Sequence, residues 1–117
     1  PDIIIIQDSS LLLDKKTFAG TDAQTIVLIN SQKNISKLLP KYISKVITID
    51  ATGIALEHLG KPLMNTSLLG AFAKLTGTIK LPALKQAIRE KFAEKDPTII
   101  QKNQKAAEAA YRQTSTL

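Results

Sequence analysis

The first fifty residues alternate between short apolar runs and polar breaks. Ile3–Ile6 is an unbroken run of isoleucines, and Thr25–Asn30 is a second apolar run. Neither alternates between apolar and polar positions, which is typical of parallel strands buried on both faces. Lys45–Asp50 alternates more clearly and predicts a third strand nearer the edge of a sheet. We therefore predict three strands, with the first one in the interior of the sheet.

Two short helical segments are expected between these strands. Leu11–Leu13 predicts a brief helix, and Ile35–Leu39 predicts another that ends before Pro40. The chain begins with Pro1 instead of methionine and enters its first strand almost at once. Because a strand in the middle of a sheet needs neighbours, we expect the sequence to be an excerpt or a processed chain that lacks upstream structure.

From Ala51 onward the apolar positions follow a helical spacing of three and four residues. Ala51–Leu59 predicts a helix that ends at Gly60, since glycine readily adopts the left-handed conformation that closes a helix. Asn65 is expected to cap a second helix over Thr66–Thr76. The apolar stripe of that helix would consist of Leu68, Leu69, Phe72 and Leu75.

Prolines indicate where two further helices begin. Pro82 suits the first turn of a third helix, whose stripe would consist of Leu84, Ile88 and Phe92. Asp96 followed by Pro97 predicts a cap and the first residue of a fourth helix. Strands alternating with short helices and followed by a helical half predict an α/β fold. We expect one domain over residues 1–117, with three α/β/α layers and a largely parallel, possibly mixed, sheet.

The composition narrows the classes of function. Of the 117 residues, 44% are apolar but only 4% are aromatic, so the core must be aliphatic. The absence of cysteine excludes disulfides, thiolate metal sites and cysteine-bound iron–sulfur clusters within this chain. No apolar run is long enough to cross a bilayer, and no signal peptide is recognisable. We therefore expect a cytoplasmic protein without a membrane partner.

The net charge of +6 is concentrated in the second half of the chain, where residues 61–117 hold ten basic and four acidic residues. Such a surface attracts phosphates, acidic proteins or nucleic acid, although lysines spread over solvated helix faces give the same count. Basic and aromatic residues are not interleaved as in stacking platforms, so no nucleic-acid partner is expected. Four lysines recur every four residues and leave phosphate binding open, namely Lys33, Lys37, Lys41 and Lys45.

No catalytic or metal-binding constellation is recognisable. The glycines form neither a dinucleotide fingerprint nor a phosphate loop, and one histidine cannot build a histidine metal site. Asp8 and Asp50 end predicted strands, where α/β active sites form, but a capping role explains Asp8 as well. His58 on an apolar stripe is expected to be a partly buried packing residue. We therefore predict no catalytic and no metal-binding residue.

The segment from Asp50 to Gly77 carries a more specific pattern. It reads DATGIA over residues 50–55 and GKPLMNTSLLGAFAKLTG over residues 60–77. Later elements follow at Leu84, Ala87, Ile88 and Phe92, and at Lys102, Asn103, Ala106 and Tyr111. This ordered series resembles the gamma subunit family of the 2-oxoacid:ferredoxin oxidoreductases, which includes the pyruvate enzymes. The chain would then be the C-terminal portion of a gamma-type domain whose N-terminal Gly-rich strand–turn–helix is missing.

The resemblance implies a non-catalytic part of a multisubunit enzyme. Such enzymes decarboxylate a 2-oxoacid oxidatively, attach the acyl group to coenzyme A and reduce ferredoxin. Thiamine diphosphate, Mg and iron–sulfur clusters are expected in partner subunits of alpha, beta and delta type, and no cofactor is expected in this chain. The alternative is a small-ligand module that binds coenzyme A or a nucleotide through its basic surface.

The resemblance also selects six motif residues as the candidate site, and a structural role and a contact with a ligand or partner both stay open for them. Gly70 is expected to let its helix approach a neighbouring helix closely, while Thr52 and Gly53 would shape a strand-to-helix turn. The six are Asp50, Thr52, Gly53, Asn65, Thr66 and Gly70.

Overall fold

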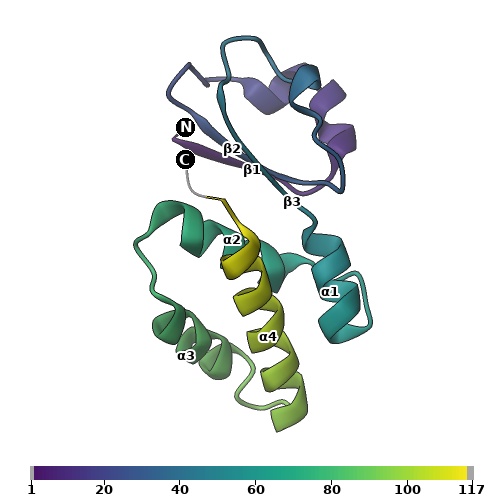
Figure 1. Cartoon of the computed structure of the whole chain (residues 1–117), viewed down its shortest axis with the longest axis vertical. Helices are drawn as coiled ribbons and strands as arrows, with labels where there is room; N and C mark the ends of the chain where they lie inside the picture. The colour runs from purple at the N-terminus through teal and green to yellow at the C-terminus, as the bar shows by residue number, and fades with distance from the viewer. Residues whose placement is uncertain (1, 116–117) are drawn as a thin grey trace. The chain divides into compact units, whose positions relative to one another are not determined.

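A computed structural model describes residues 2–115, which divide into two units (Figure 1). Residues 2–50 form the sheet unit and residues 51–115 form the helical unit. The sheet unit contains β1 (Ile3–Ile6), β2 (Ile26–Asn30) and β3 (Lys45–Ile49), with the 3₁₀ helices η1 (Ser9–Leu13), η2 (Lys15–Phe18) and η3 (Ser36–Leu38). The helical unit contains α1 (Ala51–Leu59), α2 (Asn65–Thr76), α3 (Leu81–Lys91) and α4 (Pro97–Gln113).

The three strands are parallel and lie in the order β1-β2-β3. The α/β class, the parallel sheet and the helical second half are therefore confirmed, while the three-layer arrangement stays a prediction. Among the described strands β1 lies at an edge, and 39% of Ile5 is exposed, so its predicted interior position, which requires a further neighbouring strand, stays a prediction. Isoleucine favours extended backbone through its branched side chain whether or not both faces are covered. The central strand is β2, where Val27, Leu28 and Ile29 are fully buried.

The short helices of the sheet unit complete its core. Leu12 of η1, together with Leu39 and Ile43 from the connection that follows η3, packs against strand residues in one cluster that includes Ile6, Val27 and Ile29. The Asp8 carboxylate accepts a hydrogen bond from the Ser10 backbone N–H at 3.0 Å, which confirms the capping role at the start of η1. Asp8 therefore has a structural function in the turn that follows β1.

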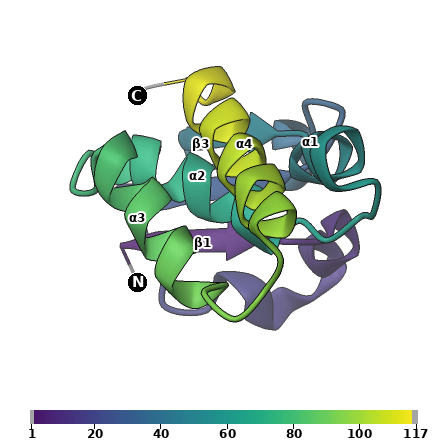
Figure 2. The same cartoon turned by 90° about the horizontal axis from the view of Figure 1, so that it is seen from below.

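In the helical unit, α4 packs against α1, α2 and α3, and Figure 2 shows it crossing α2. The buried face of α2 consists mostly of small residues, namely Thr66, Ser67, Leu68, Gly70, Ala71 and Ala73. Of the predicted stripe, Leu68 is buried and the half-buried Leu69 packs against the core around Leu84 and Ile88, whereas Phe72 and Leu75 are half-buried and do not belong to the buried face. The buried face of α4 also carries small residues: Ala106, Ala107 and Ala110 are fully buried.

Gly70 explains why small residues occupy this crossing. A Cβ atom added to Gly70 would lie 2.8 Å from the carbonyl carbon and 2.9 Å from the Cα of Ala107, and it would overlap the Ala107 carbonyl oxygen. The backbones of α2 and α4 are therefore in direct contact at this point. The expectation that Gly70 permits close helix packing is confirmed.

Most helix ends follow the sequence signals. Gly60 and Gly77 have positive φ angles of 70° and 67°, and each backbone N–H bonds back into the preceding helix. The Asp96 carboxylate accepts from the Thr98 backbone N–H at 2.7 Å, and this bond lowers the pKa of Asp96 below its usual value. The predicted cap at Asn65 was wrong, because α2 begins at Asn65 itself and the preceding Met64 makes no side-chain cap bond.

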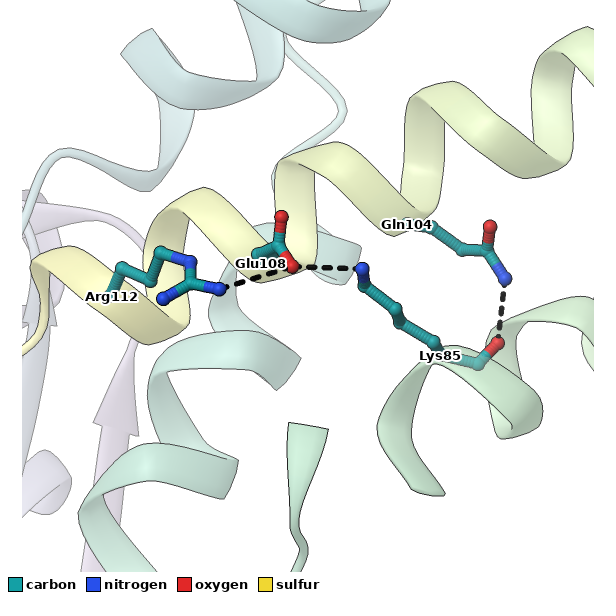
Figure 3. A network of polar contacts seen from close by, with 4 residues as sticks. All are labelled: Lys85, Gln104, Glu108 and Arg112. Carbon is teal, nitrogen blue, oxygen red and sulfur yellow. Dashed lines mark hydrogen bonds and ion pairs between the residues drawn. The ribbon is translucent and has the colours of Figure 1, made fainter. Parts of the chain in front are cut away.

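Polar contacts join α3 to α4 at the surface (Figure 3). The Lys85 ammonium lies 2.8 Å from the Glu108 carboxylate, and Arg112 reaches the same carboxylate at 3.5 Å. The Gln104 side chain donates to the Lys85 backbone carbonyl at 2.9 Å. The Lys85 hydrogen bond lowers the pKa of Glu108. Because these side chains are partly or largely exposed, the ion pairs contribute less than about 1 kcal/mol to stability. The packing of α3 on α4 therefore depends mainly on the apolar cluster around Leu84 and Ile88.

The helix crossing predicts a specific loss of stability. Gly70→Ala is expected to lower the free energy of unfolding by about 2 kcal/mol or more, because the methyl group must displace a backbone and this outweighs the ~1 kcal/mol that alanine gains in a helix. Urea denaturation of the full chain measures the loss. Gly60→Ala adds the same methyl group where no atom lies within 4 Å, so only about 1 kcal/mol of backbone strain is expected. Equal losses in the two variants would contradict the crossing.

Candidate functional site

A hollow of about 520 Å³ opens in the helical unit beside the first turn of α2. Four segments line this helical-unit hollow: the end of α1 with its connection to α2, the start of α2, the end of α3, and the first turns of α4. The lining residues are Leu59, Lys61, Leu63, Asn65, Thr66, Lys91, Phe92, Ile99, Lys102 and Asn103. Segments that are forty residues apart in the chain thus meet at one place.

Two polar side chains of the lining are fixed by a buried hydrogen-bond chain. The Thr66 hydroxyl donates to Asn103 Oδ1 at 2.9 Å, and Asn103 Nδ2 donates to the Ile99 carbonyl at 2.9 Å. Only 8% of Thr66 and 6% of Asn103 are exposed. Because both ends of the amide are bonded, Asn103 is held in one orientation and ties the start of α2 to α4.

The remaining lining combines lysines with exposed apolar side chains. Lys61, Lys91 and Lys102 are exposed, and no acidic residue is among the described residues that line the hollow. The Lys91 ammonium lies 5.7 Å from the centroid of the Phe92 ring, a distance at which a cation is attracted to an aromatic face. Leu63 is 63% exposed and Ile99 is 41% exposed. The hollow therefore offers positive charge around an apolar surface.

The six motif residues are distributed over several elements. Asn65 and Thr66 line the helical-unit hollow, and Gly70 lies one turn further along α2 at the crossing with α4. The Thr52 hydroxyl, near the start of α1, lies 3.6 Å from the sulfur of Met64. Asp50 follows β3 as the last residue of the sheet unit, and Gly53 lies within α1. A ligand or partner contact of these residues stays a prediction.

Prediction from the sequence did not assign the lysines of the hollow or Asn103 to this site. The three lysines are separated by up to forty-one positions, so no local pattern unites them. The position of Asn103 could have been recognised from the sequence, because it is a polar residue on the buried alanine stripe of α4. A buried amide on such a stripe needs partners from another element, and Thr66 supplies one.

A second hollow, of about 620 Å³, lies in the sheet unit and collects two of the four regularly spaced lysines. Lys37 and Lys41 line this sheet-unit hollow beside hydroxyl and amide groups. The Lys45 ammonium instead bonds to the Gln24 side chain at 2.9 Å. The complete lining is Asn34, Lys37, Leu39, Pro40, Lys41, Ile43, Ser44, Val46 and Thr48.

His58, in the helical unit, is partly buried, as predicted.

Residues 2–115 contain neither a cluster of metal ligands nor a membrane-spanning helix. They contain no group of three or more histidine, aspartate or glutamate side chains placed to hold a metal ion. None of their helices has the length and apolar character that a membrane span requires. The cytoplasmic location stays a prediction.

The comparison with known protein families shows to which family this chain belongs. Residues 1–113 match the family described as pyruvate ferredoxin/flavodoxin oxidoreductase. The chain belongs to this family. The resemblance that the Asp50–Gly77 segment carries is thereby confirmed.

Members of the pyruvate ferredoxin/flavodoxin oxidoreductase family with assigned names give a consistent picture. The common subunit gamma of the pyruvate/ketoisovalerate oxidoreductases of Thermococcus kodakarensis is 42% identical, over 97% of this chain and 62% of the relative. Pyruvate synthase subunit PorC of Methanocaldococcus jannaschii is also 42% identical, over 97% of this chain and 60% of the relative. The chain thus spans about three-fifths of the length of these relatives.

A solved structure of the family has the same fold. The crystal structure of the pyruvate oxidoreductase subunit PORC from Thermotoga maritima superposes with a TM-score of 0.86 at 27% identity. The match covers 98% of this chain and 64% of that subunit.

Adjacent hydroxyls at the start of α2 are expected to differ in their effect on stability. Thr66→Val should lower the free energy of unfolding by about 1–3 kcal/mol, because it leaves the buried Asn103 Oδ1 without its donor. The hydroxyl of Ser67 is fully buried and has no hydrogen-bond partner among the described residues. Ser67→Ala should therefore change stability by less than about 0.5 kcal/mol or raise it. Urea denaturation of both variants tests this, and a greater loss for Ser67→Ala would contradict the bonding scheme.

Proposed function

We propose that this chain is the C-terminal portion of the gamma-type subunit or domain of a pyruvate:ferredoxin oxidoreductase and that it is a structural component of that enzyme. The observation that carries the proposal is the family match over residues 1–113. The relatives named as gamma and PorC subunits support the assignment of the subunit type. In this proposal the assembled enzyme decarboxylates pyruvate oxidatively, transfers the acyl group to coenzyme A and reduces ferredoxin.

The residues of this chain do not fit the cofactors that such chemistry requires. A thiamine cofactor supplies the carbanion stabilisation, and iron–sulfur clusters carry the electrons. The chain has no cysteine to ligate a cluster. The described residues also contain no group of three or more histidine, aspartate or glutamate side chains that could hold a metal ion. We therefore assign these cofactors to partner subunits of alpha, beta and delta type.

The role left to this chain is to hold surfaces in a fixed geometry. The Gly70–Ala107 contact sets the separation of α2 and α4, and the Thr66–Asn103 bond fixes the register one turn earlier. The exposed apolar residues Ile99, in the first turn of α4, and Leu63, in the connection that precedes α2, lie beside this framework. Exposed apolar side chains that cluster around a hollow favour contact with another protein. The helical unit therefore has the features of a rigid docking element.

Reconstitution of the assembled oxidoreductase tests the proposed function. With an affinity tag on the thiamine-binding subunit, the full polypeptide that contains this chain is expected to co-purify in a fixed ratio. Omission of this polypeptide is expected to abolish pyruvate-dependent reduction of ferredoxin. By itself it is expected to bind no thiamine diphosphate and to release no CO₂ from pyruvate. Activity of the polypeptide alone, or its consistent recovery without other subunits, would refute the proposal.

The sheet-unit hollow favours a second candidate function, the binding of coenzyme A or a nucleotide. Lys37 and Lys41 are the paired cations, and Ser44 and Thr48 supply hydroxyls beside them. Calorimetry with coenzyme A on the full chain is expected to show an affinity that drops about tenfold in Lys37→Glu/Lys41→Glu, since two charge contacts are reversed. The control Lys16→Glu/Lys33→Glu changes the same charge outside the hollow. No heat at millimolar coenzyme A, or equal effects of both variants, would exclude this function.

A further inference from the structure

The side chains that line the helical-unit hollow carry a positive charge that no acidic residue of the lining neutralises. Residues 51–117 contain ten basic and five acidic residues. Among the residues that line the hollow, Lys61, Lys91 and Lys102 carry charge and no acidic residue does. Asp96 lies near Lys102 and its lowered pKa keeps it ionised, so it offsets part of this charge, but it does not line the hollow and the three lysines there leave a positive excess. The occupant of this hollow must therefore carry negative charge to be complementary.

The apolar part of the lining indicates a second property of the occupant. Leu63, Phe92 and Ile99 come from three different segments and contribute large side chains to the same hollow. Leu63 and Ile99 are both exposed. Covering them releases water from apolar surface, which favours the binding of an occupant that has an apolar side chain of its own.

The polar groups of the hollow favour a polypeptide over a small anion. The buried amide of Asn103 and the hydroxyl of Thr66 are bonded to each other and to the Ile99 carbonyl, so the charged groups that an occupant meets in the lining are the three lysines. The lysines are long, exposed and adaptable, and such charges on the rim of an interface steer and select acidic protein surfaces. The first turn of α2 adds the positive end of a helix dipole.

From this combination we propose that the helical-unit hollow is a docking site for a segment of another subunit in which acidic side chains flank one large apolar side chain. The apolar side chain enters between Leu63, Phe92 and Ile99, and the carboxylates reach the lysines. The inference rests on the proposed function, because it names the chemistry of the partner that the helical unit contacts.

Site-specific photo-crosslinking in the assembled oxidoreductase tests this docking site. A benzophenone amino acid replaces Leu63 or Ile99 in the hollow, or Leu56 on α1 as a control, which is 49% exposed and outside the lining. Sequencing of the crosslinked peptides is expected to return one segment of another subunit from both hollow positions, with more acidic than basic residues and a large apolar side chain. The control position is expected to miss that segment.

Charge reversal supplies the second measurement. The variant Lys61→Glu/Lys91→Glu/Lys102→Glu is expected to lower the crosslink yield about tenfold, whereas the matched control Lys80→Glu/Lys95→Glu/Lys105→Glu is expected to change it less than about twofold. A neutral or basic crosslinked segment, equal effects of both variants, or loss of the crosslink in millimolar phosphate would overturn the docking site. If the subunits co-purify without this crosslink, only the docking site is refuted. If they do not co-purify, the proposed function is refuted as well.

Discussion

The helical unit depends on the contact between the backbones of α2 and α4 at Gly70 and Ala107. A helix pair that touches at the backbone has no side chain to absorb a change in spacing, so van der Waals contact between backbone atoms sets the separation of the helices. The alanines of α4 extend this close approach along the helix. Side chains near the crossing, including Thr66 and Asn103, are therefore brought within hydrogen-bonding distance without adjustment.

The helical-unit hollow is a by-product of this close packing. Where α2 begins, the connection from α1 and the end of α3 flank the crossing, and their large side chains line a space beside it. The exposed leucine and isoleucine cannot enter a core that is already filled by small residues. Their exposure and the three lysines that line the same hollow are the basis for the proposed docking of another subunit.

Local signals in the sequence predicted the elements well. The Asp96-Pro97 pair and Gly77 each act within a few residues of their own position, so the structure follows them directly. Features that depend on distant parts of the chain could not be predicted from local patterns. The position of β1 in the sheet depends on which strands flank it, and the hollow depends on lysines from three segments. On α2 the spacing of large apolar residues misled, because Gly70 directs the small residues toward α4.

The buried amide of Asn103, bonded at both ends, has a consequence for molecular recognition. Its bond to the Ile99 carbonyl holds it on α4, its bond to Thr66 connects α4 to α2 across the hollow, and the next turn of α2 is in contact with the α4 backbone. The walls cannot separate without breaking a buried bond or parting two helices. A surface that keeps its shape before a partner arrives pays little entropy on association, so even a short segment can be bound with selectivity.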